Sequence, residues 1–284
     1  MAVVLKGAPV TAAMNEEMAA LAAALTAQGV LPTLAILRVG ERADDLAYES
    51  SAMKRCQKVG VAVKNVILPE DAAPEVFFEA LEDLNGDPAV HGILMLRPLP
   101  GQLDGEKARQ MLSPAKDVDG CTDGSLAGVF TNTDLGFPPC TAQAAMEILD
   151  FYGIDCAGKR AVVIGRSLVV GRPAAMMLLH KNATVTICHT KTADLPALVR
   201  DADIVIAASG QMESLGAECF RAGQVVIDVG IGWNEDKGKL CGDVRFDEAE
   251  PIVRAITPVP GGVGSVTTGI LVKHVIHAAA KALE

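Results

Sequence analysis

The sequence is poor in aromatic residues and in positive charge. Aromatic residues make up 4% of its 284 residues, and its 25 lysines and arginines are outnumbered by 35 aspartates and glutamates, for a net charge of −10. A nucleic-acid-binding surface needs a basic face, so this composition argues against a nucleic-acid partner. An anionic substrate would have to meet a local basic pocket, against the overall field of the protein.

Cysteines are present, but they lack the spacing of zinc sites and disulfide frameworks. The seven cysteines are scattered, no C-x-x-C pattern occurs, and none lies at zinc-ligand spacing from any of the five histidines. We therefore predict no metal site. A scattered, odd-numbered set is typical of reduced thiols, so we expect a cytoplasmic protein.

Targeting and membrane segments are also lacking. Asn15, Glu16 and Glu17 interrupt the first apolar stretch, so no signal-peptide pattern is predicted. Residues 255–272 carry no charge, but prolines and glycines crowd the first half of this stretch. Such a stretch predicts a loop followed by a helix, not a membrane span.

What the sequence does contain is a regular alternation of apolar runs and helical patterns, which predicts an α/β fold with largely parallel sheets. The length also favours two lobes. In the first lobe we predict strands at 31–39, 61–68 and 90–96 and helices at 11–28, 44–59 and 74–85. In the second we predict strands at 160–165, 183–189, 203–208 and 224–229 and helices at 141–151 and 171–181. The segment 116–140, rich in Gly, Asp, Thr and Pro, predicts a domain boundary. The lobes are accordingly assigned as residues 1–137, joined by the returning helix 266–284, and residues 138–265.

A glycine-rich turn follows the strand at 160–165. Gly165 and Gly171 enclose five residues before a helix, where free amides could bind phosphate. The spacing is not G-x-G-x-x-G, so a plain strand–turn–helix remains an alternative to nucleotide binding. The end of the next strand reads CHTKT (188–192), with Thr190, Lys191 and no acid, which together with Arg166 favours NADP over NAD. A solvated lysine and a capping threonine would explain the same residues.

Three features of the sequence could contact a flat, polar ligand. Tyr48, on a predicted helix, could stack on a heterocycle or could be a core residue. Asp117 and Asp119 lie in the boundary segment, where a carboxylate could bind an amino-pyrimidine edge or could form a turn. The loop 258–264 could wrap a ligand or act as a rigid linker.

Five motifs in order along the chain carry a resemblance to a known family. They are KDVDG (116–120), PPCTAQ (138–143), VVIGRSLVVGRP (162–173), ATVTICHTKT (183–192) and TPVPGGVGSVT (257–267). Their order and spacing closely resemble the methylenetetrahydrofolate dehydrogenase/cyclohydrolase family, the bacterial FolD type. The resemblance implies two α/β lobes around a cleft, with the nucleotide-binding lobe Rossmann-like, and a homodimer. It also implies oxidation of 5,10-methylenetetrahydrofolate by NADP, with NAD as a possible substitute.

The resemblance also implies which residues form the sites. The cofactor site carries over onto Gly165, Arg166, Ser167, Thr190 and Ile231. The folate site carries over onto Tyr48, Asp119, Pro260, Gly261 and Gly262, with Tyr48 and Asp119 as the catalytic residues. Arg166 and Thr190 would face the 2′-phosphate, and Asp119 would hold the pterin edge.

The chain departs from the family at the site of ring hydrolysis. The family has a lysine four residues after the tyrosine and a glutamine in the strand motif G-I-L-V-Q-L-P-L-P; here these positions are Ala52 and Leu96. Asp45 and Ser265 replace a serine and a proline nearby. Lys54 would lie about 240° around the helix from Tyr48, too far to substitute without a register shift.

Because both members of one hydrogen-bonded pair are absent together, we predict a dehydrogenase whose cyclohydrolase activity is weak or lost. One alternative is a bifunctional enzyme in which Lys54 or a water acts for the lysine. Another is a catalytically silent folate- and nucleotide-binding regulator.

Overall fold

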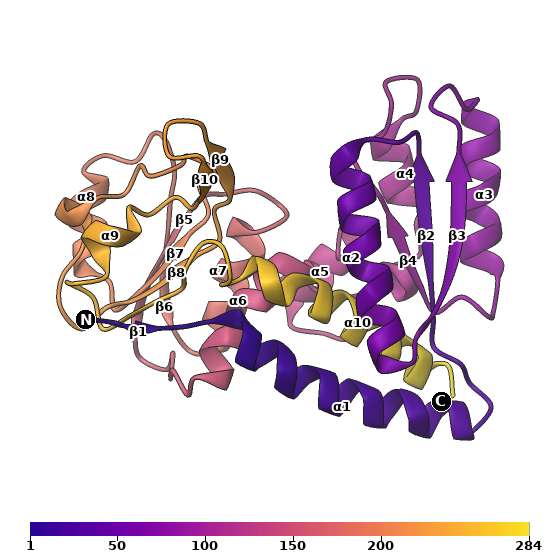
Figure 1. Cartoon of the computed structure of the whole chain (residues 1–284), viewed down its shortest axis with the longest axis horizontal. Coiled ribbons are helices and arrows are strands. Elements are labelled where there is room, and N and C mark those ends of the chain that lie inside the picture. Colours follow the sequence, from indigo (N-terminus) through magenta and orange to yellow (C-terminus); the bar gives the residue numbers. More distant parts are fainter. Residues whose placement is uncertain (284) are drawn as a thin grey trace. The chain divides into compact units, whose positions relative to one another are not determined.

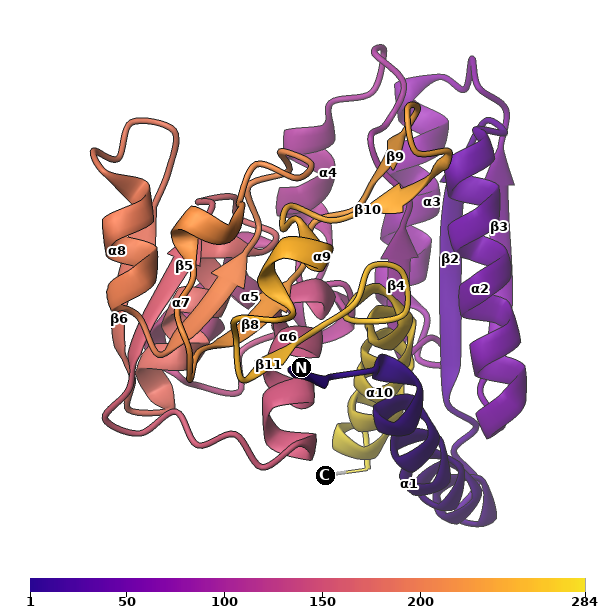
Figure 2. The ribbon, with the colours of Figure 1, turned by 60° about the vertical axis from the view of Figure 1, so that its left-hand side comes forward.

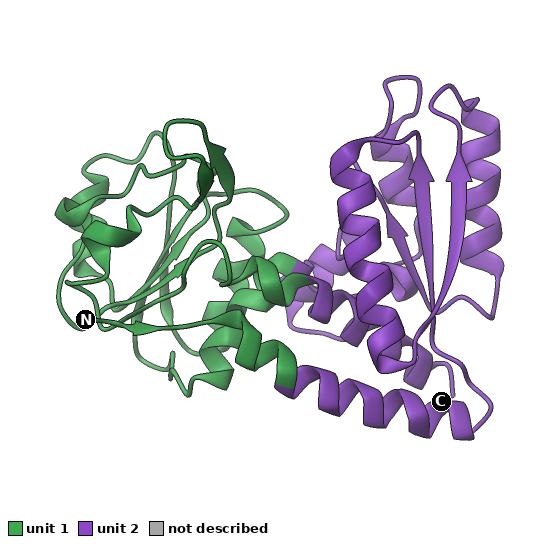
Figure 3. Cartoon of the chain, in the orientation of Figure 1, with its two compact units in different colours: residues 1–12, 141–267 green, residues 13–140, 268–284 purple. Residues whose placement is uncertain are grey.

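The computed structural model describes residues 1–283 and divides into two compact units (Figure 3). Unit 1 comprises residues 1–12 and 141–267, and unit 2 comprises residues 13–140 and the segment from residue 268 onward. The division falls within two long helices, α1 (Gly7–Ala27) and α10 (Gly264–Lys281). The sequence predicts that residues 1–12 belong to the first lobe. In the structure they group with unit 1, because β1 (Val3–Val4) pairs with its sheet.

Unit 2 contains a three-stranded parallel sheet in the order β3-β2-β4 (Figure 1). Its strands are β2 (Thr33–Val39), β3 (Ala62–Leu68) and β4 (Gly92–Met95). Its helices include α2 (Ala43–Val59), α3 (Pro74–Gly86), α4 (Gly105–Met111), η1 (Pro114–Lys116) and α5 (Asp123–Thr131). Ala35 and Leu37 pack in one core cluster with residues of α3 and α4, while Leu34 and Ile36 are buried on the opposite face. Both faces of this sheet are therefore covered, as parallel sheets require.

Helix α2 carries the residues that matter most for the site, and local signals fix its ends. Asp44 and Asp45 lie in its first turn and Lys58 in its last, where each complements the helix dipole. Gly60 ends the helix in the left-handed conformation, with φ 79°, and its amide donates to the Cys56 carbonyl. The helix is continuous between these ends, so every side chain along it has a defined face.

Unit 1 contains a six-stranded parallel sheet in the order β1-β11-β8-β7-β5-β6. Figure 2 labels four of its strands, β5, β6, β8 and β11. Its strands after β1 are β5 (Arg160–Ile164), β6 (Thr184–Cys188), β7 (Ile204–Ala207), β8 (Val225–Asp228) and β11 (Ala255–Ile256). Its helices are α6 (Cys140–Phe151), α7 (Gly171–His180), α8 (Leu195–Asp201), η2 (Ala217–Cys219) and α9 (Phe246–Ala249). Two further strands, β9 (Gly232–Asn234) and β10 (Lys239–Cys241), form a separate antiparallel hairpin. Alternate strand residues pack with α8, η2 and α9 in one core cluster.

The α/β fold class predicted from the sequence is confirmed. Every predicted strand and helix is present, and the largest difference is at α1, which begins four residues earlier than the predicted start at residue 11. The boundary segment 116–140 is less irregular than expected, since it contains α5, which Thr122 caps by accepting from the Ser125 amide. None of the helices within residues 1–283 combines the length and apolar character needed to cross a bilayer.

Candidate active site

The glycine-rich turn of unit 1 requires both of its glycines. Gly165 has φ 122°, and a Cβ there would lie 2.0 Å from the Ala208 carbonyl oxygen. A Cβ at Gly171 would lie 2.2 Å from the Gly165 carbonyl oxygen. Any side chain at either position would push the turn away from β7 or from the start of α7. The turn therefore lies close against the sheet and leads into the N-terminus of α7, where free amides attract phosphate.

Ser167 holds this turn from within. Its hydroxyl oxygen accepts from the Val170 amide at 3.1 Å and from the Gly171 amide at 3.5 Å, and its carbonyl accepts from the Arg172 amide at 3.1 Å. The structure thus gives Ser167 a turn-forming role.

A pocket of about 300 Å³ opens beside the turn, within unit 1. It brings together three predicted cofactor residues, Gly165, Arg166 and Thr190. Residues that the sequence analysis missed complete its polar lining: His189, Ser209, Gln211 and Ser214. Ser209 follows β7, and the carboxyl ends of neighbouring parallel strands meet at one edge, so strand order could have found it. Among the described residues, no carboxylate lines this pocket.

A buried acid sets the position of the loop after β7. Asp243 is 1% exposed, and its Oδ2 accepts from the Ser209 amide at 2.6 Å, the Ser209 hydroxyl at 2.9 Å and the Gly210 amide at 3.1 Å. Three donors on one oxygen hold the loop against the sheet edge. The loop that contributes Ser209 to the pocket lining is therefore held in place by Asp243.

The remaining residues predicted in unit 1 lie outside this pocket. Ile231 is 63% exposed and follows β8. Pro260 and Gly261 are exposed on the loop 258–264, whereas Gly262 is buried. The loop is fixed at its base, because the Gly261 carbonyl accepts from the Gly7 amide at 2.8 Å and the Gly262 carbonyl accepts from the Ser265 hydroxyl at 2.7 Å.

In unit 2, the two aspartates of the KDVDG motif have different roles. Asp117 is fully buried, and its carboxylate accepts from the Cys121 and Thr122 amides and from the Ser125 hydroxyl, at 2.6–3.0 Å. It therefore forms a turn, the alternative that the sequence left open. Asp119 leaves a quarter of its side chain exposed, and its carboxylate pairs with Arg97 and receives a hydrogen bond from Cys140.

Arg97 joins Asp119 to the surroundings of Tyr48. Its Nη2 lies 3.2 Å from the Asp119 Oδ2. Burial raises the pKa of Asp119 to about 6, against the lowering effect of Arg97. Burial also raises the pKa of the Tyr48 hydroxyl far above its usual value, and the negative charge of Asp119 raises it further. Tyr48 therefore stays protonated, within electrostatic reach of a carboxyl that ionises close to neutral pH.

The two positions where the family has the lysine and its glutamine partner are buried and apolar here. Ala52 is 0% exposed and Leu96 is 6% exposed. Lys54 lies on the exposed side of α2. Glu49, one turn before Ala52, is buried, and its carboxylate accepts from the Arg38 Nε at 2.6 Å. Its charge is thus neutralised by a partner on β2.

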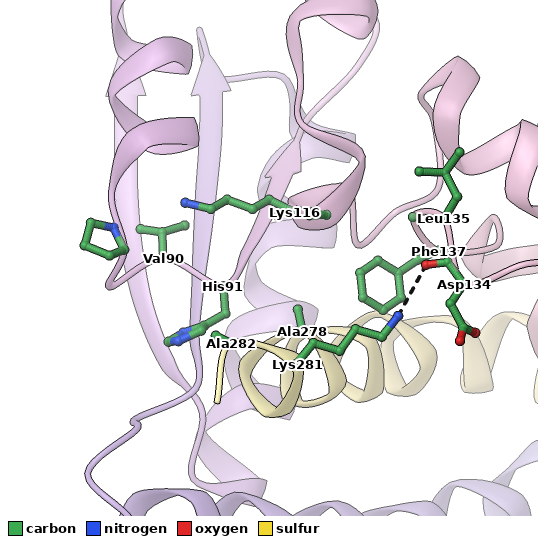
Figure 4. Close-up of a pocket in the computed structure, with 12 residues that line it drawn as sticks. Val90, His91, Lys116, Asp134, Leu135, Phe137, Ala278, Lys281 and Ala282 are labelled. Carbon is green, nitrogen blue, oxygen red and sulfur yellow. Dashed lines mark hydrogen bonds between the residues drawn. The ribbon is translucent and has the colours of Figure 1, made fainter. Parts of the chain in front are cut away.

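Unit 2 contains a pocket of about 470 Å³, shown in Figure 4. Tyr48, Ala52, Leu96, Arg97 and Asp119 do not line it. Lys116, the first residue of the KDVDG motif, lines it, but its Nζ donates to the carbonyls of Leu84 and Asp87. Lys281 donates to the Asp134 carbonyl, the dashed line in Figure 4, and lies 5.5 Å from the Phe137 ring centroid. Both ammonium groups therefore already donate hydrogen bonds to backbone carbonyls of the protein.

Comparison with known proteins identifies two domains of one family along the chain. Residues 5–119 match the catalytic domain, and residues 139–283 the NAD(P)-binding domain, of the tetrahydrofolate dehydrogenase/cyclohydrolase family. The bifunctional protein FolD of Carboxydothermus hydrogenoformans is 50% identical over 275 residues, which cover 96% of each chain.

Two solved structures extend the comparison to the fold. The crystal structure of FolD from Campylobacter jejuni has a TM-score of 0.95 at 36% identity and covers 99% of both chains. The Trypanosoma brucei methylenetetrahydrofolate dehydrogenase-cyclohydrolase, solved with NADP cofactor and an inhibitor, has a TM-score of 0.92 at 34% identity and covers 100% of this chain and 99% of that one. The family predicted from the five motifs is thereby confirmed, as is a nicotinamide dinucleotide cofactor. The chain belongs to the tetrahydrofolate dehydrogenase/cyclohydrolase family.

Proposed function

We propose that this enzyme oxidises 5,10-methylenetetrahydrofolate to 5,10-methenyltetrahydrofolate with reduction of NADP, and that its cyclohydrolase activity is weak or lost. The observation that carries the second part is the burial of Ala52 and Leu96, at 0% and 6% exposure, where the family has a lysine and its glutamine partner. The same positions here offer neither a proton acceptor nor a hydrogen-bonding group.

The preference for NADP rests on the pocket beside the glycine-rich turn. Arg166, His189 and Thr190 supply cationic and hydroxyl groups to it, and no carboxylate from the described residues opposes them. A ribose 2′-phosphate would be bound there, whereas a ribose hydroxyl is usually held by an acid. The close approach of Gly165 to β7 leaves the backbone open to the pyrophosphate, so the residues present fit the cofactor. We propose that Ile231 and Ser167 contribute to cofactor binding from the loop backbone.

Hydride transfer demands little proton chemistry from the protein. NADP, when bound, supplies the nicotinamide that takes up the hydride, and the lone pair of a folate nitrogen drives its departure. The residues of this chain then have to bind and orient the folate. Tyr48 would stack on its rings and Asp119 would accept from the pterin edge. Pro260, Gly261 and Gly262 are proposed as further folate-binding residues.

Hydrolysis of the methenyl product requires a base, and few side chains near Tyr48 could act as one. Tyr48 itself stays protonated, because burial raises its pKa. Glu49 is paired with Arg38, and Lys54 is exposed on another side of α2. A missing general base typically costs about 10²–10⁴-fold in rate.

Two other functions remain as alternatives. A bifunctional enzyme would need Lys54 or a bound water to act for the absent lysine, and relatives such as the Carboxydothermus protein are named as bifunctional. A silent regulator would keep the folate and nucleotide sites without turnover. The fixed turn at Gly165 and the exposed carboxylate of Asp119 favour an enzyme, because hydride transfer needs no more than those.

One spectrophotometric experiment tests the proposal. The purified protein is mixed with methylenetetrahydrofolate and NADP, and nicotinamide reduction and methenyl absorbance are followed together. We expect NADP to be reduced and methenyltetrahydrofolate to accumulate. Methenyl decay without protein gives the spontaneous rate to subtract. Absence of any nicotinamide reduction would favour the regulator, and rapid protein-dependent methenyl decay would favour the bifunctional enzyme.

We further propose a homodimer that works in the cytoplasm. All seven cysteines, each within the described residues, are free thiols, which suits a reducing compartment. Sedimentation velocity of the purified protein tests the assembly, since a mass near twice 29.5 kDa is expected and a single-chain mass would exclude the dimer.

A further inference from the structure

The chain lacks one cation that its family has and contains another nearby. Position 52, a lysine in the family, is Ala52 here, and position 97, a leucine in the family strand motif, is Arg97. The family glutamine between them along the strand is Leu96. The segment after β4 therefore has a positive side chain at position 97, one residue after the position of the family glutamine. No positive side chain comes from the corresponding turn of α2.

The geometry shows what this charge contacts. Arg97 follows β4 directly, and its Nη2 reaches the Asp119 Oδ2 at 3.2 Å across 22 residues of sequence. The two side chains are 32% and 25% exposed, so the pair is neither a free surface contact nor sealed in the core. The Asp119 side chain, a quarter of which is exposed, is accessible to a ligand.

We propose that Arg97 is a positioning residue for the folate: its guanidinium fixes the Asp119 carboxylate as an acceptor for the N–H donors of the pterin edge. The proposal rests on the proposed function, since it assumes that Asp119 binds the pterin. It assigns to Arg97 a task that the family performs without an arginine at this position. Arg97 acts through Asp119, and it neither accepts a proton nor contacts the migrating hydride.

The chemistry of the pterin edge explains why this matters. Its 2-amino group and ring N3–H are both donors, and only an ionised carboxylate accepts from both. A protonated Asp119 would direct an O–H toward one of those donors. Burial works against ionisation here, because it raises the pKa of Asp119 to about 6, and Arg97 is the positive group that lowers it.

The other groups that face Asp119 do not supply a positive charge. Asp117, on the preceding turn, raises the pKa of Asp119, while a hydrogen bond from Cys140 at the start of α6 lowers it. Tyr48 on α2 is neutral, and Cys121 lies next in the loop with its pKa raised by burial. Removing Arg97 therefore raises the pKa of Asp119 toward or above neutrality, and the carboxyl is then protonated over more of the working pH range.

Three variants of the full-length protein test the proposal. Arg97→Leu introduces the family residue, Arg97→Lys keeps the charge, and Arg160→Leu is the control. Arg160 forms a comparable pair with Asp201 at 2.6 Å, in unit 1 and outside the cofactor pocket. For each protein, KM for methylenetetrahydrofolate, kcat, and the dissociation constant for NADP are measured from about pH 5 to about pH 9.

We expect Arg97→Leu to raise the folate KM about 10-fold at neutral pH, and to shift the acid limb of kcat/KM upward by about one to two pH units. Raising the pH should recover most of the loss. Arg97→Lys should restore the position of the limb, while Arg160→Leu should leave it unchanged. The dissociation constant for NADP should be the same in all four proteins.

Unchanged folate KM and an unchanged acid limb in Arg97→Leu would overturn the proposal while leaving the dehydrogenase assignment standing. No NADP reduction by the unmutated protein would instead overturn the proposed function. If Arg97→Leu folds poorly, as judged by thermal unfolding, the acid limb of kcat/KM in Arg97→Lys decides. A charge effect predicts that this variant has the same acid limb as the unmutated protein. A guanidinium needed only for packing predicts that its acid limb is displaced.

Discussion

Restoring the family pair at positions 52 and 96 is the sharpest perturbation that the structure suggests. Ala52 is 0% exposed, so a lysine there adds three methylenes and an amine to filled space. Overpacking of this kind costs about 1–3 kcal/mol. Desolvation of an unpaired ammonium adds to it and lowers the pKa of the amine. With about 2–4 °C lost per kcal/mol, Ala52→Lys alone should unfold on the order of 10 °C lower than the unmutated protein.

The neighbourhood of α2 predicts that the single variant hydrolyses poorly as well. Glu49 lies three residues before Ala52 on the same helix, and a lysine at 52 could turn toward its carboxylate in competition with Arg38. Leu96→Gln would give the amine a carbonyl partner instead, which recovers about 1–3 kcal/mol of the loss. Ala52→Lys with Leu96→Gln should therefore be more stable, and a better hydrolase, than Ala52→Lys.

The assay is the protein-dependent decay of methenyl absorbance at equal protein concentration, beside thermal unfolding of each variant. The double variant should exceed the unmutated protein by about 10²-fold or more, the typical effect of one general base. Lys54→Ala is the matched control, and it should change neither the rate of methenyl decay nor the rate of NADP reduction. If the unmutated protein already removes the methenyl product rapidly, the reasoning from Ala52 and Leu96 is refuted; loss of that activity in Lys54→Ala would identify the substitute.

Four further outcomes follow from the two units taken separately. Arg166→Ala should reduce the preference for NADP by about 1.5–3 kcal/mol, read from kcat/KM with each cofactor, and equal efficiencies in the unmutated enzyme would contradict this. Asp119→Ala should lower kcat/KM for the folate while the dissociation constant for NADP stays constant; the reverse result would mean that the two sites are exchanged. Gly165→Ala should cost at least about 2 kcal/mol of stability and abolish cofactor binding, because its Cβ would lie 2.0 Å from the Ala208 carbonyl oxygen; normal thermal unfolding would disprove the close approach. Burial raises the pKa of Asp228 to about 7, so the folded protein holds that proton more tightly than the unfolded chain does. The free energy of unfolding should then fall as pH rises from about 4 to about 7, and a pH-independent value in urea titrations would contradict this.

The fold could be predicted from the sequence because its signals are local. Buried parallel strands appear as continuous apolar runs, and helix ends carry their own markers, such as Gly60 after α2. What could not be predicted were elements too short to show a period. The strands β1 and β11, of two residues each, exist because they complete a sheet, and their pairing depends on residues about 250 positions apart.

Some of the candidate site residues could likewise be predicted from local sequence signals, and others could not. The glycine-rich turn could be located because glycines directly after a strand mark a tight turn, and the structure adds why both Gly165 and Gly171 are needed. Arg97 could not be singled out, because nothing local distinguishes an arginine that reaches a carboxylate 22 residues away from one that faces solvent. The separate roles of Asp117 and Asp119 also required knowing which backbone amides surround each carboxylate.

The assembly of each unit from two distant stretches affects how the protein is made. During synthesis β1 cannot pair until β11 has emerged from the ribosome, more than 250 residues later. The buried residues of α10, such as Ile270, Val275 and Ile276, are the last to arrive in unit 2. Neither unit is one continuous segment: unit 1 is incomplete until the residues up to 267 are made, and unit 2 needs the segment from residue 268 onward. A truncated product that ends before residue 268 would leave the apolar surface that α10 covers exposed, a natural target for chaperones and proteases.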